Sequence, residues 1–387
     1  MNTTKLKNVC VVVSGTTPKS TDKRYWNGTH VWITPAELSE DSFIVTDSER
    51  HITDEAIKAT GLKSFPKGTV LLSSRAPIGK VAIAGCEMYC NQGFKNLICS
   101  ESIYNLYLYY FLKSKTAYLN SLGRGATFKE ISKGIVEDIS IPFPVYSEQI
   151  RIAKQLQKIS ELISLKKGQY RYFDDIIRSR FIEMFGDPII NPFGYPIHKL
   201  GEYIEFLTSG SRGWAQYYAD DGNDWFITIK NVKNCKIMID NMQTINAPKN
   251  AEAKRTKVKE GDLLISITAD LGRTGIVTKE IEDKGAYINQ HLSCIRLNRH
   301  VLEPLYVAYF MESKAGKKQF IKENQSAVKA GINFKSIQSL KLIVPPLAMQ
   351  KKFLLFFTEV DKSKLAVQKS LDELETLKKS LMQTYFG

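Results

Sequence analysis

The sequence predicts an α+β fold with two tandem β-rich domains, each followed by a long α-helix, and an antiparallel coiled coil between the two helices. Three observations support this fold class. Segments of the first half recur in the same order in the second half, short apolar runs bounded by glycine or proline are typical of buried strands, and heptad patterns close both halves. The predicted boundaries are 1–147 for the first β-rich domain, 148–187 for the first helix, 188–346 for the second domain and 347–387 for the second helix.

An internal repeat determines this organisation. The segment Lys67-Gly-Thr-Val-Leu-Leu-Ser-Ser matches Glu260-Gly-Asp-Leu-Leu-Ile-Ser-Ile at an offset of 193 residues. Gln149, at the start of the first helix, matches Gln350 at an offset of 201. The order is kept while the offset drifts, which indicates one fold used twice with loops of different length.

The elements within each half follow from local pattern. Val70-Leu-Leu-Ser and Leu263-Leu-Ile-Ser-Ile are expected to be buried strands, because each is a short apolar run next to a glycine. Residues 106–115 and 305–314 are expected to be helical. Residues 139–144 and 341–346 are expected to form closing strands that end at prolines, which lack the amide proton needed to continue a ladder.

The long helices are predicted from a repeat of alternating three- and four-residue steps over roughly five heptads. A helix of about 38 residues rises ~1.5 Å per residue and is on the order of 55 Å long. The apolar positions expected to pair the helices are Ile152, Leu156, Ile159, Ile163, Tyr170, Phe173 and Ile177 in the first helix and Phe353, Phe357, Val360, Val367, Leu371, Leu374 and Leu381 in the second.

Charged residues interrupt both apolar stripes. Lys166 and Arg180 interrupt the first, and Lys364 and Lys378 interrupt the second. An antiparallel pairing would set each interruption opposite an apolar level, although the pattern alone does not fix the direction. The alternative is two surface helices, each packed on its own domain; such helices have no need of a strict 3.5-residue period over this length.

Composition narrows the functional class. The chain has 54 Lys plus Arg against 40 Asp plus Glu, a net charge of +14, and most of the surplus lies in the two β-rich segments rather than in a tail. A polyanionic partner is one explanation and an incidentally basic protein is the other. The six cysteines show no CxxC pair, and the first residues show no apolar leader, so a cytoplasmic protein with buried free thiols is expected.

The order of these pieces resembles a known family. A β-rich module, a long helix, the segment Glu183-Met-Phe-Gly-Asp-Pro188, a second module and a second helix are similar to the specificity subunit of type I restriction–modification systems. The segments Ser209-Gly-Ser-Arg-Gly-Trp-Ala-Gln-Tyr-Tyr218 and Leu71-Leu-Ser-Ser-Arg-Ala-Pro-Ile-Gly-Lys80 carry the resemblance further. It implies that each module is a target-recognition domain for one part of a split double-stranded DNA site. It also implies that the helices set the spacing and bind two methyltransferase subunits.

Paired loops supply the candidate DNA contacts. The loops 14–19 and 209–214 follow the first predicted strand of each module, where glycine and serine permit close backbone approach to phosphate and arginine can bond guanine. Asn-Gln pairs could bond adenine, or could be turns that bond their own backbone. A third basic loop is expected to contact phosphates. The candidates are Thr16, Thr17, Lys19, Arg75, Lys80, Asn91, Gln92, Arg124, Lys129, Ser211, Arg212, Trp214, Arg273, Asn289, Gln290, His291, Lys329 and Lys335.

The sequence predicts no catalytic residues, no metal site and no bound cofactor. No GxxxxGK[ST] phosphate loop and no methyltransferase N/D-P-P-Y/F motif is present. The resemblance implies that S-adenosylmethionine, ATP and Mg²⁺ belong to the methyltransferase subunits and to motor–nuclease subunits of a larger complex. A stand-alone nuclease or methyltransferase and a bipartite transcriptional regulator are the competing hypotheses.

Overall fold

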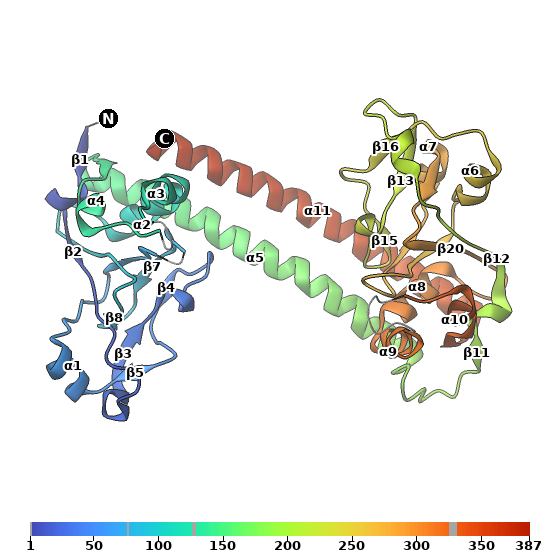
Figure 1. Ribbon diagram of the computed structural model, residues 1–387, viewed down its shortest axis with the longest axis horizontal. Coiled ribbons are helices and arrows are strands. Elements are labelled where there is room, and N and C mark those ends of the chain that lie inside the picture. Colours follow the sequence, from blue (N-terminus) through green and yellow to red (C-terminus); the bar gives the residue numbers. More distant parts are fainter. Residues whose placement is uncertain (1, 76, 126–128, 325–330) are drawn as a thin grey trace. The chain divides into compact units, whose positions relative to one another are not determined.

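The computed structural model of the protein describes residues 2–75, 77–125, 129–324 and 331–387. The chain divides into two compact units: unit 1 comprises Met1–Gly168 and Val367–Gly387, and unit 2 comprises Gln169–Ala366. The chain passes between units inside two helices of 40 residues each, α5 (Tyr146–Phe185) and α11 (Leu347–Phe386) (Figure 1). Each unit therefore contains one β-rich domain and part of both long helices.

Unit 1 is built on a five-stranded sheet in the order β2-β9-β6-β7-β4, accompanied by a three-stranded sheet in the order β5-β3-β8 and by the pair β1-β10. The strands are β1 (Thr3–Lys5), β2 (Cys10–Val13), β3 (Trp26–Ile33), β4 (Ile44–Val45), β5 (His51–Ile52), β6 (Val70–Leu72), β7 (Val81–Ala84), β8 (Tyr89–Cys90), β9 (Asn96–Cys99) and β10 (Ser140–Pro142). The α-helices before α5 are α1 (Asp54–Thr60), α2 (Asn105–Ser114), α3 (Thr116–Leu122) and α4 (Lys133–Glu137).

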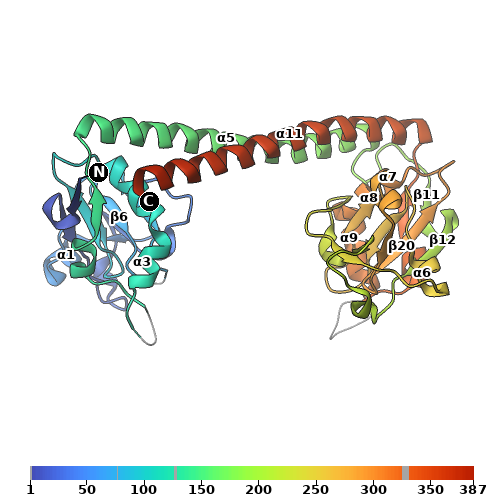
Figure 2. The same cartoon turned by 90° about the horizontal axis from the view of Figure 1, so that it is seen from above.

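Unit 2 repeats this plan with a four-stranded sheet in the order β12-β20-β17-β18, a three-stranded sheet β16-β13-β19, and the pairs β14-β15 and β11-β21. The strands are β11 (Ile197–Lys199), β12 (Ile204–Ser209), β13 (Asp224–Ile227), β14 (Val232–Lys233), β15 (Lys236–Ile237), β16 (Gln243–Ile245), β17 (Leu263–Ser266), β18 (Thr274–Ile276), β19 (Ala286–Ile288), β20 (Leu292–Leu297) and β21 (Lys341–Ile343). The helices are α6 (Ala251–Thr256), α7 (Lys279–Lys284), α8 (Pro304–Glu312), α9 (Lys314–Glu323) and α10 (Phe334–Ser339). Within unit 2, α6 lies on the side remote from α11 (Figure 2).

The predicted repeat is confirmed at the level of strand register. Val70 pairs with Leu97 in unit 1, and Leu263, 193 residues after Val70, pairs with Ile295 in unit 2. The predicted buried strands are β6 and β17, and the predicted shorter helices are α2 and α8. One detail differs from the prediction. The loop that starts at Ser14 follows the second strand of its module, because the short β1 precedes it and pairs with the closing strand β10.

A buried glutamine attaches each long helix to its module. Gln149 is fully buried, accepts a hydrogen bond from the backbone N–H of Tyr104 (2.9 Å), and donates to the carbonyl oxygens of Ser102 (3.1 Å) and Pro144 (3.0 Å). Gln350 makes the equivalent three bonds in unit 2, at 2.8 to 3.1 Å. A glutamine amide suits this position because one side chain both accepts and donates. The repeat at these two positions therefore reflects the start of each helix.

The helices pair in antiparallel orientation, as predicted. In unit 1 the hydroxyl of Tyr385 donates to Gln155 at 3.0 Å, and Lys167 lies 3.0 Å from Glu375. In unit 2, Lys364 forms an ion pair with Asp174. Higher numbers on one helix meet lower numbers on the other in both units. Every apolar position predicted for the pairing is buried or half-buried.

Each long helix begins in one unit and ends in the core of the other. The ring of Phe386, at the end of α11, lies 5.2 Å from that of Tyr107 on α2. The ring of Phe185, at the end of α5, lies 4.9 Å from that of Tyr306 on α8. The alternative of two helices packed only on their own domains is therefore wrong.

Aromatic rings accommodate three of the four charged interruptions. The ammonium group of Lys364 lies 4.4 Å from the ring centre of Tyr170, and the guanidinium carbon of Arg180 lies 5.5 Å from that of Phe356. Lys378 lies 5.9 Å from the ring of Tyr110, and burial lowers its pKa. A cation over an aromatic face keeps favourable electrostatics where water is excluded.

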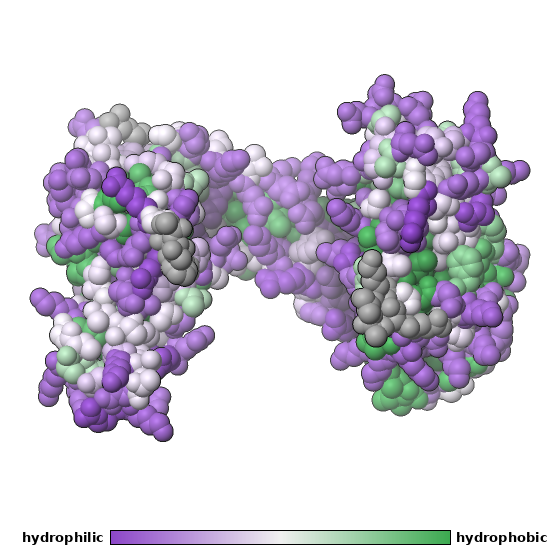
Figure 3. Space-filling model, viewed as in Figure 1, coloured by the Kyte–Doolittle hydropathy of each residue, from purple (hydrophilic) through white to green (hydrophobic). Residues whose placement is uncertain are grey.

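The surface in Figure 3 is mostly hydrophilic, with a hydrophobic group at the lower end of unit 2 where the chain leaves α5. The exposed apolar side chains of that segment are Ile189, Ile190, Phe193 and Ile197. Within the part of the chain that the structure describes, no helix is both long and apolar enough to cross a membrane.

Candidate nucleic-acid interface

In each unit the loop after the second strand packs against the Asn-Gln turn. A side chain at Gly15 would place its Cβ 1.6 Å from the carbonyl oxygen of Cys90, and one at Gly210 would place it 2.1 Å from that of Ile288. These glycines therefore permit close approach of protein backbone. In unit 1 the contact continues through Thr17, whose hydroxyl lies 2.6 Å from the amide oxygen of Gln92.

The asparagine of the Asn-Gln pair is part of a turn in both units. The side-chain oxygen of Asn91 accepts from the N–H of Gly93 at 2.8 Å, and that of Asn289 accepts from the N–H of His291 at 3.1 Å. The backbone N–H of each asparagine donates to an isoleucine carbonyl on the neighbouring strand at 3.1 Å. Of the two interpretations of the repeated pair, these bonds favour the structural one for the asparagines.

The second loop of each unit is shaped by a buried serine. The Ser73 hydroxyl accepts from the N–H of Lys80 at 2.8 Å and donates to the carbonyl of Pro77 at 2.7 Å. Ser266 accepts from the N–H of Arg273 at 2.8 Å in the same way. This loop presents the predicted residues Arg75, Lys80 and Arg273, each of which is half-buried.

A third loop joins the other two. The N–H of Ile131 donates to the carbonyl of Ser74 at 3.0 Å, and the N–H of Ile332 donates to that of Ile267 at 3.0 Å. The Asn-Gln turn bonds the same segment from its other side: Ser74 N–H donates to Gly93 at 2.8 Å. We define loop cluster 1 as the described residues of 73–80, 91–93 and 123–131, and loop cluster 2 as those of 266–273, 289–291 and 331–332.

Loop cluster 1 carries a network of charges. The Lys95 side chain is 10% exposed, and its ammonium group lies 3.0 Å from a carboxylate oxygen of Glu130, whose other oxygen lies 3.7 Å from Arg75. Glu130 pairs through its backbone with both Arg75 and Arg124. The predicted Arg124 and Lys129 are exposed, whereas the Lys80 ammonium group donates to the carbonyl of Pro35 at 3.1 Å.

Loop cluster 2 carries different side chains and different polar contacts. His291 bonds the hydroxyl of Thr268 through Nδ1 at 2.6 Å and the amide of Gln290 through Nε2 at 3.0 Å. Arg273 forms an ion pair with Asp270. The predicted Lys335 is exposed on α10, and the predicted Lys329 lies outside the described residues.

The predicted residues of the loop 209–214 occupy different environments. Arg212 is exposed. Trp214 is buried at 3% exposure, with its ring 5.2 Å from that of Phe226 and its N–H donating to Glu252 at 2.9 Å. The ring of Trp214 is therefore part of the core, and the structure gives it no surface to offer to DNA. Hydrogen bonds from Ser211 and Trp214 hold the pKa of Glu252 below its usual value.

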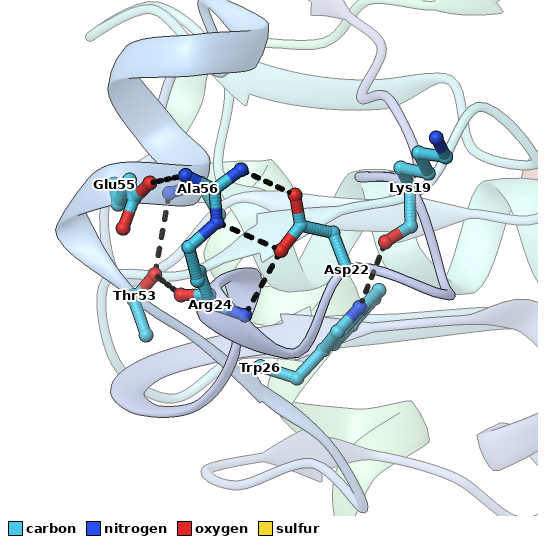
Figure 4. Close-up of polar contacts among 7 residues, drawn as sticks. All are labelled: Lys19, Asp22, Arg24, Trp26, Thr53, Glu55 and Ala56. Atoms are coloured by element: carbon cyan, nitrogen blue, oxygen red, sulfur yellow. Dashed lines mark hydrogen bonds and ion pairs between the residues drawn. The ribbon is translucent and has the colours of Figure 1, made fainter.

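Thr16 and Lys19, two exposed predicted residues, lie in a loop that hydrogen bonds fix in place (Figure 4). The indole N–H of Trp26 donates to the carbonyl of Lys19 at 3.2 Å. Asp22 accepts three bonds from Arg24, at 2.7, 3.0 and 3.2 Å, which keep the pKa of its carboxyl below the usual value. The ammonium group of Lys19 points away from this network (Figure 4).

Lys95, Glu130 and Arg255 are functional candidates that only the structure reveals. The guanidinium group of Arg255, on α6, donates to the Ser209 carbonyl at 2.8 Å and to the Ser211 hydroxyl at 3.0 Å. No motif marks Arg255, because it is 44 residues from Ser211 along the chain. Lys95 could have been noticed as a cation directly after the Asn-Gln turn.

Two copies of one sheet-and-loop architecture, each with a polar loop cluster and linked by antiparallel helices, define a class of protein with two related domains. The family model described as "Type I restriction modification DNA specificity domain" matches residues 1–171 and 197–376. The chain therefore belongs to this family.

Individual relatives agree with this assignment. The type I restriction enzyme MjaIX specificity subunit of Methanocaldococcus jannaschii is 35% identical over 246 residues, covering 59% of this chain and 57% of that protein. The EcoKI specificity subunit of Escherichia coli is 22% identical over 336 residues, covering 81% and 72%. This chain matches somewhat over half the length of the MjaIX subunit and 26% of the putative MjaX subunit of the same organism.

Solved structures show the same fold. The type I restriction–modification S subunit from M. genitalium aligns with a TM-score of 0.62 at 15% identity, covering 100% of this chain and 96% of that chain. A chain from a study of complex assembly and conformational transition of the type I system aligns with a TM-score of 0.60 at 18% identity, covering 100% and 97%.

Proposed function

We propose that this chain is the DNA-reading subunit of a type I restriction–modification complex, with unit 1 and unit 2 each contacting one part of an asymmetric, bipartite target. The observation that carries the proposal is the recurrence of one three-loop cluster in both units, built by the same backbone hydrogen bonds but lined by different side chains. The shared backbone arrangement of the two loop clusters indicates that both units have the same kind of function. Their different side chains indicate that the two units recognise different base sequences.

Charge supports DNA as the ligand. Loop cluster 1 presents Arg75, Arg124 and Lys129, and the second unit presents Arg212 and Lys335. Flexible exposed cations suit phosphate oxygens, whereas arginine can also bond a guanine edge with two parallel hydrogen bonds. The basic surplus lies in the two β-rich segments, as such contacts require.

The helices are proposed to set the spacing between the two parts of the target. The chain passes between the units only within α5 and α11, so their combined length and twist constrain which base pairs both units can contact together. Inserting one heptad into each helix at the unit boundary adds roughly 10 Å at 1.5 Å per residue. This insertion is expected to lengthen the preferred gap in the target by about three base pairs.

The same helices are proposed to bind two methyltransferase subunits, and through them motor–nuclease subunits. Exposed leucines support a protein partner: Leu165 on α5 is 70% exposed, and Leu355 and Leu365 on α11 are 67% and 62% exposed. S-adenosylmethionine, ATP and Mg²⁺ are assigned to those partners, and this chain is proposed to contribute recognition without catalysis.

Sequencing of methylated DNA tests the proposal. A host without type I enzymes would express the methyltransferase subunit with this chain, with the heptad-insertion variant, or alone. We expect a two-part motif with the wild-type chain, a changed gap with the insertion variant, and no methylation from the methyltransferase alone. Methylation by this purified chain without a partner, or an unchanged gap with full activity, would contradict the proposal.

A further inference from the structure

Lys95 contacts all three loops of loop cluster 1. Its ammonium group donates to the carboxylate of Glu130 at 3.0 Å, to the hydroxyl of Ser74 at 3.4 Å and to the carbonyl of Gln92 at 3.5 Å. These partners come from the third loop, the second loop and the Asn-Gln turn. The residue is only 8% exposed, so the charge is almost withdrawn from water and depends on these partners.

Unit 2 has a serine at the equivalent position. The N–H of Lys95 donates to the carbonyl of Leu72 at 2.9 Å, and Ser293, 198 residues further on, pairs with Ile265 in the corresponding ladder. The hydroxyl of Ser293 is fully buried and has no hydrogen-bond partner among the described residues. The lysine is therefore not required by the scaffold, because the same strand register forms without it.

The distances around Glu130 show which cation it holds more closely. Lys95 lies 3.0 Å from one carboxylate oxygen, while the guanidinium group of Arg75 lies 3.7 Å from the other. Arg75 and Arg124 flank Glu130 through backbone bridges, so all three side chains leave neighbouring points of a small ladder. The buried lysine therefore makes the shorter contact with Glu130, while Arg75 is held only by the longer contact and Arg124 is exposed.

We infer that Lys95 is a positioning residue for DNA recognition by unit 1: it joins the three loops of loop cluster 1 and, by making the shorter contact with Glu130, leaves Arg75 only weakly paired and able to contact DNA. The inference rests on the proposed function. Without the Lys95 charge, Glu130 has Arg75 as its remaining close cation and draws it away from DNA. Unit 2 has Ser293 at the equivalent position and therefore lacks this lysine–glutamate contact. Loss of the Lys95 charge is accordingly expected to alter recognition of only the part of the target that unit 1 contacts.

The inference can be tested because a variant is expected to fold. Methionine in place of Lys95 fills much of the volume of the lysine methylenes, and Glu130 is 37% exposed, so water can solvate its carboxylate. The matched control is Ser293→Ala, which removes an unpartnered hydroxyl at the equivalent position. Lys95→Arg keeps the charge and tests rescue.

The experiment maps methylated sites in cells that express the methyltransferase subunit with wild-type chain, Lys95→Met, Lys95→Arg, Ser293→Ala, Arg75→Ala or the Lys95→Met/Arg75→Ala double variant. We expect Lys95→Met to raise methylation of sites mismatched in one part of the motif by about tenfold, an energy typical of one charge-assisted hydrogen bond. Arg75→Ala is expected to relax specificity in the same part of the motif, and the double variant is expected to relax it no further than Arg75→Ala does. Lys95→Arg is expected to restore at least half of the discrimination against mismatched sites. Ser293→Ala is expected to leave the specificity of both parts unchanged.

Three results would overturn the inference: an unchanged motif with Lys95→Met, equal relaxation of both parts, or a double variant clearly worse than Arg75→Ala. The last two indicate general loosening of the fold, and thermal unfolding of each purified complex measures that loosening directly. Absence of any two-part motif with the wild-type chain would instead refute the proposed function, so the two failures are distinguishable.

Discussion

Replacing Gln149 by leucine is expected to destabilise unit 1 by about 3 kcal/mol. The substitution removes three hydrogen bonds from a fully buried amide and leaves the N–H of Tyr104 and two carbonyl oxygens unpaired. Each bond contributes about 1 kcal/mol, and leucine is close enough in volume that no large cavity adds to the loss. The affected groups join α5 to the segment before α2, so the loss falls on the attachment of the long helix.

Hydrogen exchange under increasing urea measures this loss, because peptides from the two units report separately. Slowly exchanging amides of β6 and β9 are expected to lose about 3 kcal/mol of protection in Gln149→Leu, while those of β17 and β20 are unchanged; Gln350→Leu should do the reverse. The exposed Gln169→Leu on α5 is the control, with a change below about 0.5 kcal/mol. A loss under about 1 kcal/mol at Gln149, or an equal loss at Gln169, would refute the reasoning.

Four further substitutions test other parts of the structure. Gly210→Ala places a Cβ 2.1 Å from a backbone carbonyl oxygen and is expected to lower the free energy of unfolding by about 2 kcal/mol. Gly168→Ala, in a helix with nothing within 4 Å of the new Cβ, is expected to raise it by about 0.5 kcal/mol. Urea unfolding compares the two variants, and equal effects would contradict the packing argument. Lys364→Leu at a buried heptad position should stabilise the helix pairing by about 1 kcal/mol, and a loss of similar size would show that its ion pair dominates. Because Arg24 keeps the pKa of Asp22 below 3.8, the Asp22 carboxylate stabilises the folded state above that pH and loses this contribution as the pH falls through its lower folded value. The difference in unfolding temperature between wild type and Asp22→Asn should accordingly vanish in acid, and a difference that persists would exclude this linkage.

The fold was largely predictable because burial leaves periodic traces in a sequence. The heptad steps through Ile152 and Leu156, and their counterparts Phe353 and Phe357, could be recognised without coordinates, since a paired helix must bury the same face at every turn. The repeated Gln149 and Gln350 marked the helix starts, although the reason, three bonds to each buried amide, became visible only in the structure.

The candidate site was predictable only as a set of loops. Their glycines and basic residues were visible in the sequence, but Gly15 and Gly210 turned out to pack against protein backbone. Trp214 lies in the core, although its neighbours suggested a surface loop. Loop residues carry no periodicity, so the sequence does not tell which side chain points outward.

The amino-acid sequence by itself determined that one module is used twice, that two long helices pair, and that the basic surplus lies in the modules. Those properties follow from the order of the repeated segments, the period of the apolar residues and the amino-acid composition. Each of these can be determined along the chain without knowing which distant residues meet. Only the tertiary structure decided that three loops converge in each unit and that Lys95, Glu130 and Arg75 meet within a few ångströms. Contacts between residues tens of positions apart depend on strand register and turn geometry, and no pattern along the chain records them.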